Sequence, residues 1–177
     1  MPMEFILEKL EGYDRRSIGR SNEVVKEVLA NPSLFGDLLE GMLSQDPIIR
    51  MRAADAVEKI TSKHPEWLQP YKSKIIRQAS KIEQQEVRWH VAQLFSRLQL
   101  TRKERGVVVG ILSDFLTDKS KIVKTFSMQA LADIAEQDAE LREPIIEQLE
   151  ELTRTGSPAM KSRGKKLLAK LRHSAKG

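Results

Sequence analysis

The chain has 177 residues, a formal net charge of +5 and no cysteine, and 40% of its residues are hydrophobic. This hydrophobic content, with only nine Gly and seven Pro, excludes a disordered or collagen-like chain, and the lack of cysteine excludes disulfides, thiol catalysis and zinc–thiolate or iron–sulfur sites. The length predicts one domain. Because no apolar run is long enough to cross a membrane and no signal-peptide pattern is present, we expect a soluble cytoplasmic protein.

Residues 1–30 are expected to form two short helices that cap one end of the fold. Apolar residues with helical spacing lie between Ile6 and Leu10 and again between Val24 and Leu29. Ser21 or Asn22 is the predicted N-cap of the second helix, since both side chains accept hydrogen bonds from helix amides. The segment between the two helices is polar and contains two glycines.

From residue 31 onward, one apolar template recurs four times. Beginning at Ile49, apolar or small residues occupy offsets 0, 4, 7, 8 and 11, which is one face of a helix. The template begins again at Val87, Val123 and Met160, at intervals of 38, 36 and 37 residues, and a basic residue follows each starting position. Segments that share one template at a near-constant period predict a repeat array.

Another helix is predicted before each of these segments, so that every repeat is a pair of helices without a strand. These first helices are predicted at 32–43, at 67–79, after a capping box at Thr101–Glu104, and after Pro144 in a first helical turn. The pattern predicts an all-α α-solenoid, a right-handed superhelix of antiparallel helix pairs of HEAT-like or armadillo type. We expect a single solenoid domain over 1–177, which consists of the cap at 1–30 and repeats at 31–62, 63–99, 100–136 and 137–173.

The repeats resemble the HEAT repeat family over roughly residues 32–172. The resemblance rests on Pro47-x-Ile49-Arg50 with Ala53-Ala54, on Val87-Arg88 with Ala92, and on Asp118-x5-Lys124 with Ala130-Leu131. These are similar to the family's turn residue, Val-Arg pair and small-residue run. The resemblance implies a binding scaffold in which the second helix of each pair lines the concave surface.

No residue pattern indicates catalysis, a cofactor or a metal. The three histidines, His64, His90 and His173, lack metal-binding spacing, and no nucleophile elbow or glycine-rich phosphate loop is present. The acidic pairs lie on predicted helix faces, and the sequence places no further catalytic or ligand-binding residues near them. We therefore predict a non-enzymatic protein.

The predicted partner-binding site lies on the concave side of the second helices. Offsets 2 and 6 of the template point away from the apolar face, at about 100° per residue. Trp89 either contacts a partner there, since Trp is enriched at binding hot spots, or packs between neighbouring second helices. We predict that a protein or peptide partner contacts Trp89, Met51, Gln93, Thr125 and Gln129, with Arg52 at the edge.

The C-terminal end is strongly basic. Residues 154–177 carry eight Lys and Arg and no acid, whereas residues 1–153 carry 22 basic and 25 acidic side chains. We expect Met160, Leu167, Leu168 and Leu171 to pack on the preceding repeat, while basic side chains face outward: Lys161, Arg163, Lys165, Lys166, Lys170 and Arg172. These cations either complete a soluble terminal cap or bind an anionic partner.

Nucleic-acid binding through this basic end is the alternative function. It would make the chain distantly similar to DNA alkylation-repair glycosylases, which are built on HEAT-like repeats. A membrane-surface role is not expected, because the apolar side of the last helix is used in packing. The sequence names no partner and no oligomeric state.

Overall fold

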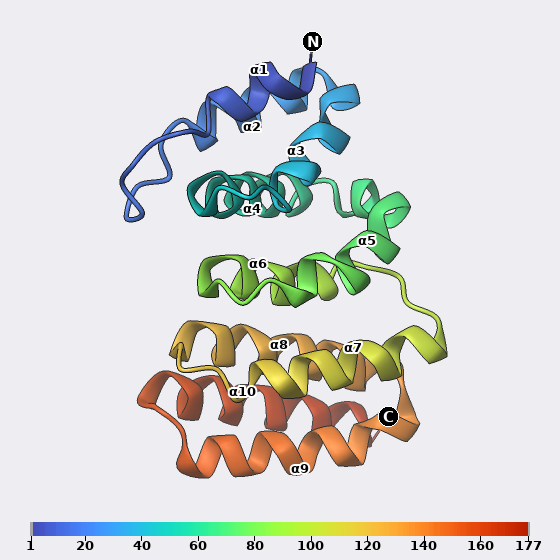
Figure 1. Cartoon of the computed structure of the whole chain (residues 1–177). Helices are drawn as coiled ribbons and strands as arrows, with labels where there is room; N and C mark the ends of the chain where they lie inside the picture. Colours follow the sequence, from blue (N-terminus) through green and yellow to red (C-terminus); the bar gives the residue numbers. More distant parts are fainter. Residues whose placement is uncertain (1, 177) are drawn as a thin grey trace. The chain divides into compact units, whose positions relative to one another are not determined.

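A computed structural model describes residues 2–176, with side chains from residue 5 onward, and every regular element within these residues is helical (Figure 1). The chain divides into two compact units, Met1–Leu98 (unit 1) and Gln99–Gly177 (unit 2). The division falls one residue before the boundary predicted between repeats 63–99 and 100–136, and the single domain and the repeat bounds stay predictions. In the described part of the chain, no helix is both long enough and apolar enough to cross a membrane.

Unit 1 is built around α4, which packs against α2, α3 and α6. Fully buried apolar side chains such as Leu38, Ile60 and Leu94 form its core. Its α-helices are α1 (Pro2–Glu8), α2 (Ser21–Ala30), α3 (Phe35–Gly41), α4 (Pro47–Thr61), α5 (Lys72–Arg77) and α6 (Gln85–Phe95). Three 3-10 helices accompany them: η1 (Pro32–Leu34), η2 (Pro65–Tyr71) and η3 (Ala79–Lys81).

The continuous helix predicted over 67–79 is wrong. The segment forms the 3-10 helix η2, then α5, which is only six residues long, and then the 3-10 helix η3. Pro70 lies inside η2. Because proline has no amide hydrogen and its ring crowds the preceding turn, it prevents a regular α-helix from running through this position.

The predicted capping role of Ser21 or Asn22 is also wrong. Helix α2 already includes Ser21, and its N-cap residue, Arg20, makes no side-chain capping bond. The buried Ser21 hydroxyl instead donates to Asp55 Oδ2 of α4 at 2.6 Å. A contact between two residues that are 34 positions apart and lie on different helices thus takes the place of the local cap.

Unit 2 consists of two long helix pairs, α7 (Arg102–Phe115) with α8 (Lys121–Gln137), and α9 (Ala139–Thr155) with α10 (Pro158–Ser174). The predicted capping box is confirmed: Thr101 Oγ1 accepts from the Glu104 amide, and the Glu104 carboxylate accepts from the Thr101 amide. Pro144, however, lies inside α9 and not in its first turn. The helix begins earlier because the Asp138 carboxylate caps the amides of Glu140 and Leu141.

The basic C-terminal helix is part of the fold. Met160, Leu167, Leu168 and Leu171 are all buried, as predicted, and α10 packs against both α8 and α9. Gly164 allows this close approach, because a Cβ at that position would overlap the Thr153 hydroxyl of α9 and lie 2.9 Å from Thr153 Cβ.

Polar side chains connect positions about one repeat apart in the sequence. In unit 1, Gln84 Oε1 accepts from Arg50 Nε at 3.1 Å, and Gln84 Nε2 donates to the Pro47 carbonyl at 2.9 Å. In unit 2, Arg105 Nε donates to Asp138 Oδ2 at 2.9 Å. Such bonds fix how successive helix pairs stack, in addition to the apolar packing between them.

Candidate partner-binding face

The candidate site is the second-helix face, which we define in each unit by the second helix of each pair: α2, α4 and α6 in unit 1, and α8 and α10 in unit 2. In unit 1, α4 packs between α2 and α6, and in unit 2, α8 packs against α10. The predicted binding residues on α4 and α6 therefore belong to one unit, and those on α8 and α10 to the other.

Met51 and Arg52 do not have the exposure that was predicted for them. Met51 is 8% exposed and Arg52 is 4% exposed. Both lie on α4, whose sides are covered by neighbouring elements of unit 1. Neither side chain is available to a partner on this surface, so this part of the prediction is corrected.

Arg52 organises the polar segment between α1 and α2. Its guanidinium donates to four main-chain carbonyls: Leu10 at 3.1 Å, Glu11 at 2.6 Å, Asp14 at 3.2 Å and Ser17 at 3.0 Å. A Cβ at Gly12 or Gly19 would lie 2.5 or 2.6 Å from Arg52 Nη1, and Gly19 adopts a φ of +55°. The two glycines let the main chain wrap around this buried cation.

Trp89 and Gln93 lie on α6 and are half-buried, so both have surface available to a partner. The Trp89 ring meets the His90 ring edge-on, with centroids 5.7 Å apart, and His90 Nδ1 is 2.9 Å from Gln93 Oε1. Burial lowers the pKa of the His90 imidazole, although the bond with Gln93 and the nearby carboxylates of Asp55 and Glu58 oppose this effect. The imidazole beside Trp89 therefore loses its proton more readily than a histidine in water does.

Two acidic side chains of α4, Asp55 and Glu58, are already paired. Asp55 Oδ2 accepts from Ser21 and, at 2.6 Å, from Lys59. Glu58 Oε1 accepts from Arg97 Nη2 at 2.7 Å, and Arg97 also donates to the Glu58 carbonyl. Sequence reasoning missed the Ser21–Asp55 and Arg97–Glu58 contacts, because in each the two residues come from different repeats.

In unit 2, the second-helix face contains a groove of about 540 Å³ between α8 and α10. Two residues of α8 line it: Thr125 and Gln129. Six residues of α10 complete it: Ala159, Ser162, Arg163, Lys166, Leu167 and Lys170. The groove thus combines two residues from the predicted partner-binding set with three from the predicted anion-binding set.

A short hydrogen-bond chain fixes the floor of this α8/α10 groove. Arg163 Nη1 donates to Gln129 Oε1 at 2.7 Å, and Gln129 Nε2 donates to Asp133 Oδ1 at 3.0 Å. The Thr125 hydroxyl donates to the Lys121 carbonyl one turn earlier at 2.8 Å. These bonds hold the Gln129 amide and the Arg163 guanidinium in defined positions without occupying the groove.

The remaining predicted cations differ in their surroundings. Lys170 forms an ion pair with Glu136 at 3.1 Å, which raises the pKa of Lys170, and Arg172 forms an ion pair with Glu150 of α9. Lys161, Lys165 and Lys166 are exposed, and the structure shows no ion pair for them. Of these three, Lys166 lines the groove.

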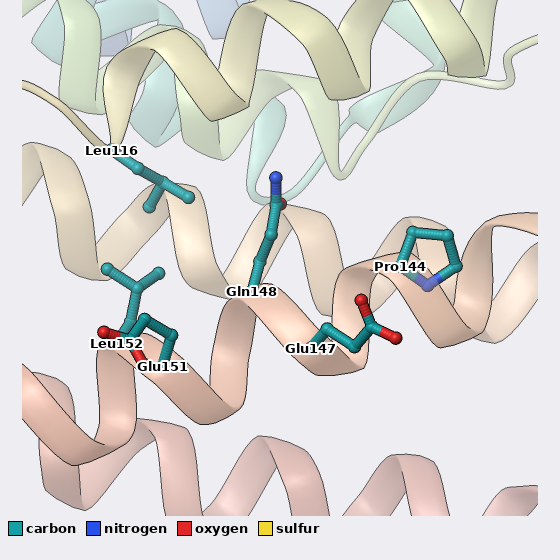
Figure 2. A pocket seen from close by; sticks show the side chains of 6 residues that line it. All are labelled: Leu116, Pro144, Glu147, Gln148, Glu151 and Leu152. Atoms are coloured by element: carbon teal, nitrogen blue, oxygen red, sulfur yellow. The ribbon is translucent and has the colours of Figure 1, made fainter.

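A second hollow, of about 550 Å³, lies on the first-helix side of unit 2 (Figure 2). Leu116 and Leu152 point toward one another across it, and Pro144 lies farther along α9. Glu147 and Glu151 border it, so its charge is opposite to that of the α8/α10 groove. Sequence reasoning did not single out this hollow.

Among the described side chains, no group of three or more His, Asp or Glu residues is arranged to hold a metal ion. The polar groups described above act as caps, ion pairs and links between repeats.

The chain matches the family described as HEAT repeat domain over residues 8–171, and it belongs to this family. No curated protein matches it in sequence. Family membership and the all-helical structure identify the fold as an α-solenoid, while the right-handed superhelix stays a prediction. HEAT repeat domains generally mediate protein interactions and are typically non-enzymatic.

Proposed function

We propose that this protein is a non-enzymatic interaction module that binds a segment of a partner protein on its second-helix face. The observation that carries the proposal is the α8/α10 groove, where Gln129 and Arg163 are fixed by hydrogen bonds and exposed side chains surround them. In unit 1, half-buried Trp89 and Gln93 offer a further contact area on α6. Met51 and Arg52 are not part of the proposed surface.

Site-specific photo-crosslinking tests this proposal. A photoreactive residue placed at Ser162, which is exposed and lines the groove, is compared with one at Asp114, which is exposed on α7. We expect a protein in native extract to crosslink from position 162 and not from 114, and unlabelled wild-type chain to compete with it. The same crosslinked proteins from both positions, or none from 162, would contradict the proposal.

Trp89 is tested separately, because it belongs to the other unit. Truncation of a hot-spot Trp commonly weakens binding by 2 kcal/mol or more, or about thirtyfold. We expect Trp89→Ala to weaken capture of the partner identified above, with circular dichroism as the folding control. Unchanged capture by a folded variant would remove α6 from the proposed surface.

Nucleic-acid binding is the weaker candidate. The cations that would carry it are partly neutralised by Glu136 and Glu150. A crosslinked nucleic acid in place of a protein at position 162 would favour it.

A further inference from the structure

The α8/α10 groove has a distinct chemical character. Three of its lining side chains, Arg163, Lys166 and Lys170, carry positive charge, and none of its lining residues is acidic. Thr125, Gln129 and Ser162 add neutral polar groups, and Ala159 adds exposed apolar surface, whereas Leu167 lines the groove but is buried. A matching ligand therefore carries negative charge together with some apolar surface.

The free cations are concentrated in the middle of the groove. Lys166 has no ion pair, and Arg163 uses one of its five N–H groups on Gln129. Lys170, at the far end, is already paired with Glu136, and Asp133 lies beside Gln129. The structure thus offers about two cations to a ligand and places carboxylates next to them.

Helix direction reinforces this charge distribution. Gln129 pairs with Arg163 and Glu136 with Lys170, both 34 positions apart, so α8 and α10 run side by side in the same direction. Their N-terminal ends consequently lie together, and the amide dipoles of both helices favour negative charge at that end. Lys121 and Lys124, which are in the first turn of α8, add to this effect.

The groove has the dimensions of a short peptide. Its lining residues on α10 extend from Ala159 to Lys170, which at 1.5 Å per residue is about 16 Å. An extended chain advances about 3.3 Å per residue, so about five residues fit along it. A polyanion with a phosphate at every step would need more free cations and would meet Asp133 and Glu136 at the groove edge.

We propose that the α8/α10 groove binds a short acidic segment of the partner protein, in which carboxylates lie against Arg163 and Lys166 and a neighbouring apolar side chain packs on the exposed Ala159. The planar guanidinium of Arg163 suits a carboxylate, because two parallel N–H groups can bind its two oxygens. This inference rests on the proposed function and names the chemistry of the bound segment.

Defined peptides test the inference independently of any natural partner. A fluorescent library of decapeptides made of Asp, Glu, Leu and Ala is screened against the full-length chain by anisotropy, with the same sequences carrying Lys in place of Asp and Glu as the charge-reversed set. We expect acidic peptides that contain Leu to bind, and the charge-reversed set not to bind. Failure of every acidic peptide, or equal binding of both sets, would overturn the inference.

A matched pair of variants locates the binding. Lys166→Glu and Lys165→Glu make the same charge change at neighbouring exposed positions of α10, but only Lys166 lines the groove. We expect Lys166→Glu to weaken binding of an acidic peptide at least tenfold and Lys165→Glu to weaken it less than threefold. Equal losses of affinity in the two variants would indicate unspecific attraction to the basic helix and would contradict the proposed site.

A short DNA duplex serves as the competing class of ligand. We expect it to bind more weakly than the acidic peptide at 150 mM salt and to respond equally to both variants. Tighter duplex binding that only Lys166→Glu abolishes would overturn the inference in favour of nucleic acid. If crosslinking from Ser162 still captures a protein while all acidic peptides fail, the proposed function stands and only the acidic chemistry is wrong.

Discussion

Arg52 shows how one buried side chain can organise a whole loop. A guanidinium out of water needs hydrogen bonds to most of its donors, and here main-chain carbonyls of the segment 10–17 supply them. The side chain is thereby committed to the fold. From the sequence, this charged side chain was predicted to contact a partner. In the structure it instead holds the connection between α1 and α2.

Arg52→Met should release this connection. The variant keeps an apolar stem but leaves the carbonyls of residues 10, 11, 14 and 17 without their donor, so we expect a loss of about 2 kcal/mol or more in the free energy of unfolding. Hydrogen exchange should accelerate over residues 11–20. Arg52→Lys should restore little of this stability, because an ammonium group cannot reproduce the planar set of N–H donors of the guanidinium. Unchanged exchange over 11–20 in Arg52→Met would contradict this role.

His90 should make the stability of unit 1 depend on pH. The charged groups around it act in both directions: Asp55 and Glu58 raise its pKa and Lys59 lowers it, but burial is the largest effect and the net shift is downward. The folded state therefore prefers the neutral imidazole more strongly than the unfolded state does. This contribution to stability is fully present above the unfolded pKa of about 6.5 and is lost as pH falls below that value.

Urea unfolding between pH 5 and 7.5 measures this contribution. We expect His90→Gln to show a smaller fall in stability with decreasing pH than the wild type, because one proton-linked group is removed. His173→Gln, at an exposed position on α10, is the matched control for the loss of a histidine. Parallel pH profiles for wild type and His90→Gln would show that His90 does not titrate in this way.

At the scale of helices, the sequence correctly predicted the features that depend on a local residue pattern. The four second helices follow from the apolar template, and the Thr101–Glu104 capping box identifies the start of α7. Two failures concern local signals that apolar spacing does not include, the proline inside the 67–79 segment and the Asp138 cap that starts α9 well before Pro144. In the third, a distant contact replaced a local one, because Ser21 bonds to Asp55 instead of capping α2. An N-cap signal is local, so it cannot reveal that another helix recruits the same side chain.

The candidate site was predictable to a similar extent. Helical spacing correctly indicated that Thr125, Gln129 and Lys166 avoid the core, and all three line the α8/α10 groove. It failed for Met51 and Arg52, because spacing at 100° per residue describes one helix and not the elements that cover its sides. The neutralisation of Lys170 by Glu136 and of Arg172 by Glu150 could not be predicted either, since each pair joins different helices.

The glycines of unit 2 provide a matched test of helix packing. Gly164 touches Thr153, whereas a Cβ at Gly110 of α7 would meet no atom within 4 Å. We expect Gly164→Ala to separate α9 from α10 and to cost about 1–3 kcal/mol, since overpacking outweighs the better helix propensity of Ala. Gly110→Ala should stabilise the chain by about 0.5–1 kcal/mol. Thermal unfolding compares the two, and a stabilising Gly164→Ala would show that the helices are not in this close contact.

At the scale of the whole chain, the uneven charge distribution makes a prediction about DNA. The net charge of +5 comes entirely from the C-terminal end, where eight cations follow residue 153 without an acid. Three of them, Arg154, Lys170 and Arg172, are bound to glutamates, which leaves five: Lys161, Arg163, Lys165, Lys166 and Lys176. Because these five are spread around α10 at about 100° per residue, with Lys176 just past its end, we infer that a duplex gains only two or three phosphate contacts at one time.

The salt dependence of duplex binding measures that number directly. The logarithm of the binding constant falls with the logarithm of salt concentration with a slope of about −0.9 per phosphate contact, so two or three contacts predict a loss of roughly ten- to fortyfold between 50 and 200 mM salt. A six-contact nucleic-acid site would lose on the order of 10³ over the same range. Lys165→Glu and Lys166→Glu should each reduce the slope by about one contact, because a diffuse cationic surface does not distinguish them. A slope near −5, or one that only Lys166→Glu lowers, would instead indicate a dedicated nucleic-acid site on α10.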